Sequence, residues 1–189
     1  MLRSVCFYLP LVIIFSLSTH GRSQENITLS HLAIADSSET TNKSSSARHL
    51  FYIERNKNAN IVIYEAQVES DGSLHSKDPV LVYWLMNEED GRRQDLNRFE
   101  RKRAYGFDSE LLAKDSVLLE LKVDIKRDVV VSRVGDNFKA VTIIEGKKAS
   151  LDRIYIMADE SGWRPDVQYL ELYGKDLSTG EDLYEKCLP

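Results

Sequence analysis

The organisation of this chain depends on Val80–Phe107, which reads VLVYWLMNEEDGRRQDLNRFERKRAYGF. Its first part, Val80–Met86, is apolar at odd and even positions alike, which is typical of a strand covered on both faces. We therefore place this strand centrally in a sheet. Asp95 is a suitable helix N-cap, and Gly106 is a suitable residue just beyond a helix C-terminus. The second part is accordingly predicted to be the main helix, lying over one face of the sheet.

One side of the predicted helix combines apolar and charged residues. At about 100° per residue, Leu96, Phe99, Glu100 and Arg103 fall on the same side. Two interpretations remain open. Glu100 and Arg103 form an ion pair at the rim of the core, with the arginine stem passing along Phe99. Alternatively, they lie inside a pocket between the helix and the sheet, where they orient a polar ligand.

The candidate ligand-binding residues are those that would line such a pocket: Trp84, Glu100, Arg103 and Tyr105. No catalytic residue is predicted. The sequence contains no Gly-x-Ser-x-Gly elbow, no glycine-rich phosphate loop and no Asp-x-Asp-x-Asp calcium loop. Its histidines also lack the spacing of metal ligands. We therefore predict no cofactor and no metal ion.

The remaining strands follow from alternation and from turn residues. Val117–Ile125 alternates most clearly between apolar and polar positions, and Gly135-Asp136-Asn137 indicates a hairpin. Asp108–Lys114 is predicted to form a further helical turn. The tail from Lys175 is polar, with a turn at Gly180. The other predicted strands are Leu50–Glu54, Ile61–Val68, Val129–Val134, Phe138–Ile144, Leu151–Met157 and Val167–Tyr173.

These elements predict an α+β domain with a mainly antiparallel sheet of about eight strands. We expect a sandwich or a partly open barrel, with one main helix packed on the sheet. The domain should span residues 49–189, a length that is sufficient to bury a sizeable core.

The chain begins with features of a secretory signal peptide. Arg3 precedes the apolar run Val5–Leu17, which is too short for a membrane span of about 20 residues. The small residues Gly21 and Ser23 follow it, and cleavage is expected after Ser23, with cleavage after Gly21 as the next choice. Residues 24–48 then form a flexible leader rich in serine, threonine and asparagine. We therefore expect an exported protein, periplasmic or extracellular, with no transmembrane span after cleavage.

Charge and cysteine content exclude several classes of protein. The chain has a net charge of −5, and cleavage after Ser23 removes Arg3 and Arg22 without removing an acid. A negative chain is a poor ligand for nucleic acid or for an anionic membrane. Cleavage also removes Cys6 and leaves Cys187 without an internal partner. The domain must then be stabilised by its core rather than by a disulfide.

Five segments together resemble the exported bacterial family called domain of unknown function 4833, over roughly residues 49–189. They are FYIERNKNANIVIYEA, DPVLVYWLM, FERKRAYGF, LDRIYIMAD and LYGKDLSTGEDLYEK. Their order and spacing carry the resemblance, since no single motif is diagnostic. The resemblance implies that residues 49–189 form one unit in a bacterial host with a periplasm. It implies no reaction, ligand or partner.

Three functions remain open at this point. The first is a non-catalytic binding or interaction module whose partner is a small ligand or an envelope protein. The second is a hydrolase-type enzyme with a non-contiguous site near the helix predicted for residues 95–106. The third is a structural, envelope-associated protein. A closed apolar cavity would favour a carrier, converging titratable groups in an open cleft would favour an enzyme, and a flat apolar patch would favour a partner surface.

Overall fold

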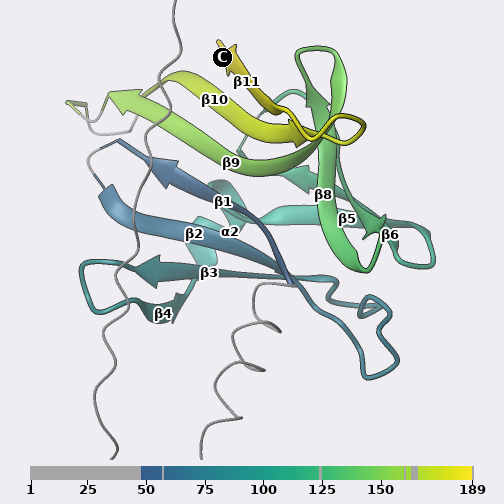
Figure 1. The fold of residues 1–189 in the computed structure, drawn as a ribbon. Helices are drawn as coiled ribbons and strands as arrows, with labels where there is room; N and C mark the ends of the chain where they lie inside the picture. Colours follow the sequence, from purple (N-terminus) through teal and green to yellow (C-terminus); the bar gives the residue numbers. More distant parts are fainter. Residues whose placement is uncertain (1–47, 57, 124, 160, 163–165, 189) are drawn as a thin grey trace, which may run out of the picture. The chain divides into compact units, whose positions relative to one another are not determined.

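The computed structural model describes residues 48–56, 58–123, 125–159, 161–162 and 166–188 (Figure 1). The chain divides into two compact units, Met1–Ala35 and Asp36–Pro189, and all described residues belong to the second. The predicted signal peptide and nearly all of the predicted leader lie outside the described residues.

The described part of the chain forms eleven strands and one short helix, α2 (Arg98–Arg103). The strands are β1 (His49–Arg55), β2 (Asn58–Ala66), β3 (Val80–Met86), β4 (Arg92–Asp95), β5 (Phe107–Ala113), β6 (Ser116–Leu121), β7 (Val129–Val134), β8 (Asn137–Ile144), β9 (Lys147–Asp159), β10 (Asp166–Asp176) and β11 (Asp182–Cys187).

Strand β9 is the branch point of the sheet. It is 13 residues long, and β10 pairs with it along almost its whole length on one side. On its other side it pairs first with β8 and then with β1, which runs parallel to it. The sheet order is therefore β4-β3-β2-β1-β9-β8-β7-β6-β5, with β10 and β11 attached beside β9. Two arms of four strands diverge from β9 and curl into a half-barrel (Figure 1).

The concave side of this half-barrel contains the core. One continuous cluster of buried residues joins both arms, β9, β10 and β11. Phe51 on β1 and Tyr64 on β2 are fully buried, and their rings stack with centroids 4.2 Å apart. Alternate residues of most strands point into this cluster, so the intervening residues of those strands are presented on the convex side.

The mainly β fold is confirmed, and the half-barrel matches the partly open barrel that was one of the two expected architectures. The expected number of strands and the role of the helix are wrong. β4, β5 and β11 were not predicted, and Asp108–Lys114, predicted as helical, belongs largely to β5. β4 is exposed throughout, and β5 is exposed from Asp108 onward. Neither strand has a buried stripe that would indicate its secondary structure in the sequence.

The central position of β3 is also wrong, since β3 lies second from the β4 end of the sheet. The helix is shorter than expected: Asn97 rather than Asp95 is its N-cap, and Ala104 is its C-cap. Gly106 is needed for a different reason than the predicted one. A Cβ atom at this position would lie 1.7 Å from the carbonyl oxygen of Arg101, so only glycine fits this turn.

Candidate functional site

The predicted Glu100–Arg103 pair is not formed. The Asn97 side chain accepts hydrogen bonds from the backbone N–H groups of Phe99 and Glu100, each at 2.9 Å. In return, the Glu100 carboxylate accepts from the Asn97 N–H at 2.8 Å. This reciprocal arrangement is a capping box, and it uses the carboxylate to begin the helix.

Arg103 is exposed, and Phe99 retains 72% of its accessible surface. Within the described part of the chain, no ion pair joins Glu100 to Arg103. The expectation that at least one member of this pair is largely buried is wrong, because α2 has only six residues and none of them is buried. The chain instead buries Leu96 before the helix and Tyr105 after it.

Trp84 and Tyr105, the other two predicted site residues, do lie together. Their rings meet edge to face with centroids 5.0 Å apart. Tyr105 is buried, its hydroxyl accepts a hydrogen bond from Arg55 Nη1 at 3.3 Å, and its backbone carbonyl accepts one from the Tyr64 hydroxyl. These contacts anchor the segment after α2 on the inner side of β1–β3. A ligand-binding role for Trp84, Glu100, Arg103 or Tyr105 stays a prediction.

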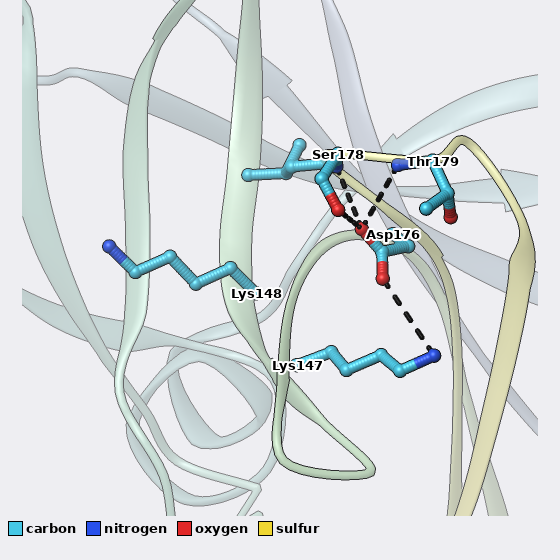
Figure 2. A pocket seen from close by; sticks show the side chains of 6 residues that line it. Lys147, Lys148, Asp176, Ser178 and Thr179 are labelled. Atoms are coloured by element: carbon cyan, nitrogen blue, oxygen red, sulfur yellow. Dashed lines mark hydrogen bonds and ion pairs between the residues drawn. The ribbon is translucent and has the colours of Figure 1, made fainter.

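A hollow of about 610 Å³ lies where the β8–β9 and β10–β11 turns meet (Figure 2). Its one carboxylate, that of Asp176, is already engaged by the β10–β11 turn through one of its two oxygens. This oxygen accepts hydrogen bonds from the Ser178 N–H at 2.7 Å, from the Ser178 hydroxyl at 2.6 Å and from the Thr179 N–H at 3.2 Å. These hydrogen bonds hold the pKa of Asp176 below its usual value. Lys147 approaches this carboxylate at 3.9 Å, whereas Lys148 extends away from it. The two ammonium groups therefore do not converge on a common ligand position.

An organised polar surface lies on the convex side of β1, β9, β10 and β11. We call it the tyrosine face and define it as Glu54, Arg153, Tyr155, Tyr169, Glu171, Tyr173, Tyr184 and Lys186. Strand alternation explains its composition. Ile154, Leu170, Leu172 and Leu183 of the same strands are buried in the core, so their neighbours in sequence point outward.

Strand register places six of these outward residues in two rows across the sheet. Arg153, Tyr173 and Tyr184 are cross-strand partners in one row. Tyr155, Glu171 and Lys186 form the adjacent row. Cross-strand neighbours on one face are close enough for their side chains to touch.

Cations cover two of the tyrosine rings. The Arg153 guanidinium lies 3.7 Å from the centroid of the Tyr173 ring, and the Lys186 ammonium lies 3.4 Å from that of Tyr169. Tyr173 also contacts Tyr184, with ring centroids 5.1 Å apart. These rings are therefore held by their neighbours rather than left free to rotate.

Hydrogen bonds complete the network of the tyrosine face. Glu171 accepts from the Tyr173 hydroxyl at 2.7 Å and from the Tyr184 hydroxyl at 3.0 Å. The bond to Glu171, together with burial, raises the pKa of Tyr173 to about 12, so this phenol stays neutral at physiological pH. Arg153 donates to Glu54 at 2.8 Å. The tyrosine face thus carries two acidic residues, Glu54 and Glu171, and two basic residues, Arg153 and Lys186. Each of these four charged side chains contacts another side chain of the same face.

Sequence reasoning missed this surface although it predicted three of its four strands. The outward residues of Leu151–Met157 and Val167–Tyr173 include Arg153, Tyr155 and Tyr173. The tyrosines in these two segments are the one sequence feature that could have indicated the tyrosine face. Their convergence depends on the β9–β10 and β10–β11 registers, and β11 was not predicted.

Two properties often used to assign function give no positive indication here. In the residues that the structure describes, no group of His, Cys, Asp and Glu side chains could hold a metal ion. The same residues contain no helix long and apolar enough to cross a membrane.

Comparison with known proteins identifies a family without a known activity. Residues 51–186 match the family described as Domain of unknown function (DUF4833). No curated protein and no solved structure matches the chain. Since the match covers most of the sequence and agrees with the resemblance seen in its segments, the chain belongs to the DUF4833 family.

Proposed function

We propose that this protein is an exported, non-catalytic interaction module that binds a folded protein partner, such as an envelope protein, through the tyrosine face. The observation that carries the proposal is the network of tyrosine, arginine and glutamate side chains on β9, β10 and β11. Tyrosine and arginine are the residue types most enriched among the energetically important residues of protein interfaces.

The order of this surface favours binding because less freedom is lost when a partner arrives. Immobilising a flexible side chain costs about 0.5–1.5 kcal/mol at an interface. On the tyrosine face, Arg153 and Lys186 are already seated on aromatic rings, and the Tyr173 and Tyr184 hydroxyls are already bonded to Glu171. A partner would therefore meet side chains that have lost much of this freedom in advance.

The same geometry favours a protein over a carbohydrate partner. A sugar ring stacks on an open aromatic face, but one face of Tyr169 and one face of Tyr173 are each covered by a cation. The balance of charge argues against a polyanion, because Arg153 and Lys186 are offset by Glu54 and Glu171. A protein surface that carries both signs of charge and hydrogen-bonding groups is the complementary partner.

Export remains part of the proposal and rests on the amino-terminal sequence. Arg3, the apolar run Val5–Leu17 and the small residues up to Ser23 support cleavage by a signal peptidase. Sequencing the amino terminus of protein from the extracytoplasmic fraction should give a chain that starts at Gln24. An intact Met1 on most molecules would contradict export by this route.

Site-specific photocrosslinking tests the proposed function. A photoreactive phenylalanine analogue at Tyr184 should give a discrete adduct in cells, and the same analogue at Glu88 in the exposed β3–β4 turn should not. The adduct should be lost on proteolysis of the partner, and its yield should fall when Tyr173→Ala is added to the same chain. Equal adduct yields at both positions, or an adduct that only a glycan-degrading enzyme removes, would contradict a protein partner on this face.

A further inference from the structure

Strand β5 provides a second surface, distinct from the tyrosine face. It ends the sheet and pairs only with β6 in the described part of the chain. Every residue from Asp108 to Ala113 is exposed. Leu111 and Leu112 retain 60% and 52% of their accessible surface, on opposite faces of the strand. Such an uncovered edge is a template for pairing with another strand.

The backbone groups available on this edge can be identified from the β5–β6 register. The Lys122 N–H donates to the Gly106 carbonyl at 2.9 Å, and hydrogen-bonded and non-hydrogen-bonded pairs alternate in an antiparallel ladder. Asp108 and Glu110 therefore direct their backbone groups toward β6. Phe107, Ser109 and Leu111 direct theirs toward the free side, where an incoming strand would bond.

The two faces of β5 differ in chemistry. On the inner face, Ser109 and Leu111 lie opposite Leu119 and Val117, both of which are buried in the core. Leu111 therefore continues the apolar inner surface to the edge of the sheet, where it ends uncovered. An incoming strand would place apolar side chains beside it.

The outer face of the same edge is acidic. Asp108 lies opposite Glu120, and Glu110 follows on the same side. Lys122 pairs with Asp108, while no ion pair in the described residues compensates Glu110 or Glu120. Basic side chains on the outer face of an incoming strand would therefore be attracted to this edge.

We propose that the free edge of β5 binds an extended peptide segment in which basic and β-branched residues alternate, by adding it to the sheet as a further strand. Backbone groups of Phe107, Ser109 and Leu111 bond the peptide. Glu110 and Glu120 select its basic residues, and Leu111 contacts its apolar residues.

A second copy of this chain fits the edge poorly. A two-fold antiparallel arrangement that uses all three free residues must centre on Ser109, because Phe107 then pairs with Leu111 of the other copy. This register places Asp108 opposite Glu110 of the other copy, twice. Like charges directly opposite each other are destabilising, so the edge disfavours self-pairing.

The experiment uses the full chain and two probe peptides, one with alternating lysine and valine and one with alternating glutamate and valine. Amide NMR spectra are followed during titration. The lysine peptide should bind saturably and shift the Phe107, Ser109 and Leu111 amides, and it should bind at least tenfold more tightly than the glutamate peptide. Its affinity should fall as the salt concentration rises.

Two substitutions separate the backbone contribution from the charge contribution. Ser109→Pro removes an N–H that faces the free edge, so it should weaken lysine-peptide binding more than tenfold, whereas the matched control Ser109→Ala should leave it unchanged. Glu110→Lys should make the chain bind the glutamate peptide more tightly than the lysine peptide. This variant does not depend on proline, so it still tests the inference if Ser109→Pro does not fold. Tyr184→Ala should not change peptide binding, which separates this inference from the proposed function.

Several results would overturn the inference. They are unchanged binding in Ser109→Pro, equal affinity for both peptides, peptide-induced shifts centred on the tyrosine face, or a dimer in solution that Ser109→Pro dissociates.

Discussion

Glu185 on β11 is predicted to contribute a measurable, pH-dependent part of the stability. Its carboxylate accepts two hydrogen bonds from the Arg127 guanidinium, both at 2.8 Å, and a third from the Glu145 N–H at 2.6 Å. Arg127 also donates to the Ile143 carbonyl at 2.7 Å. These bonds tie β11, whose one strand partner among the described residues is β10, to the segment before β7 and to the β8–β9 turn.

The size of the effect follows from the pKa of Glu185. The bonds from Arg127, followed by that from the Glu145 N–H, lower this pKa from 4.5 to about 2. At 1.36 kcal/mol per unit, such a shift corresponds to at most about 3 kcal/mol. The Arg127 and Glu185 side chains keep 23% and 27% of their exposure, and solvent screening reduces the contribution to about 1–2 kcal/mol.

The sign of the pH dependence is fixed by the direction of the shift. Because the folded pKa is lower than the unfolded one, the stabilisation is complete above pH 4.5 and is lost as the pH falls toward 2. Glu185→Gln should lower the free energy of unfolding by about 1–2 kcal/mol at pH 7. The difference between wild type and variant should shrink toward zero near pH 2.

Urea unfolding followed by tryptophan fluorescence, repeated from pH 7 to pH 2.5, measures this difference. The other acidic residues titrate equally in both proteins, so their contributions cancel in the difference between the two free energies of unfolding. Glu120→Gln, at an exposed position outside this cluster, is the matched control and should change the free energy by less than about 0.5 kcal/mol. A Glu185→Gln effect of that same small size, or one that is constant with pH, would refute the reasoning.

Four other substitutions test the fold. Tyr64→Phe leaves the Tyr105 carbonyl without its hydroxyl donor and should cost about 1–3 kcal/mol in urea unfolding; no cost would show that solvent reaches this carbonyl. Asn97→Ala should cost about 1 kcal/mol through the lost cap, whereas Arg103→Met should cost less than about 0.5 kcal/mol. Equal costs would indicate that Arg103 has a buried partner. Gly106→Ala places a methyl group on a helix carbonyl and should lower the melting temperature by several degrees, and an unchanged melting temperature would contradict the close approach.

The strands with a buried stripe could be predicted from the sequence. Val129–Val134 and Phe138–Ile144 alternate and flank a turn that contains Gly135, and they form β7 and β8 with closely matching bounds. β5 could not be found in this way. It is exposed on both faces, so its residues carry no period, and only its pairing with β6 makes it a strand.

The candidate site was harder to predict because it is built across strands. The helical period grouped Glu100 with Arg103 on the assumption that a long helix packs on the sheet. The capping box at Asn97 instead uses the Glu100 carboxylate locally. The tyrosine face requires Arg153 and Tyr173 to lie opposite each other on β9 and β10, and a single sequence does not specify that register.

Hydroxyl-radical footprinting of the tyrosine face tests the central claim most directly, because it requires no knowledge of the partner. Labelling of Tyr184, which is 43% exposed, is compared between purified protein and protein in the cells that express it. Phe99, which is 72% exposed and lies on α2, serves as the internal reference. The proposed function predicts that labelling of Tyr184 falls several-fold in cells relative to that of Phe99. An unchanged ratio of Tyr184 to Phe99 labelling would contradict it.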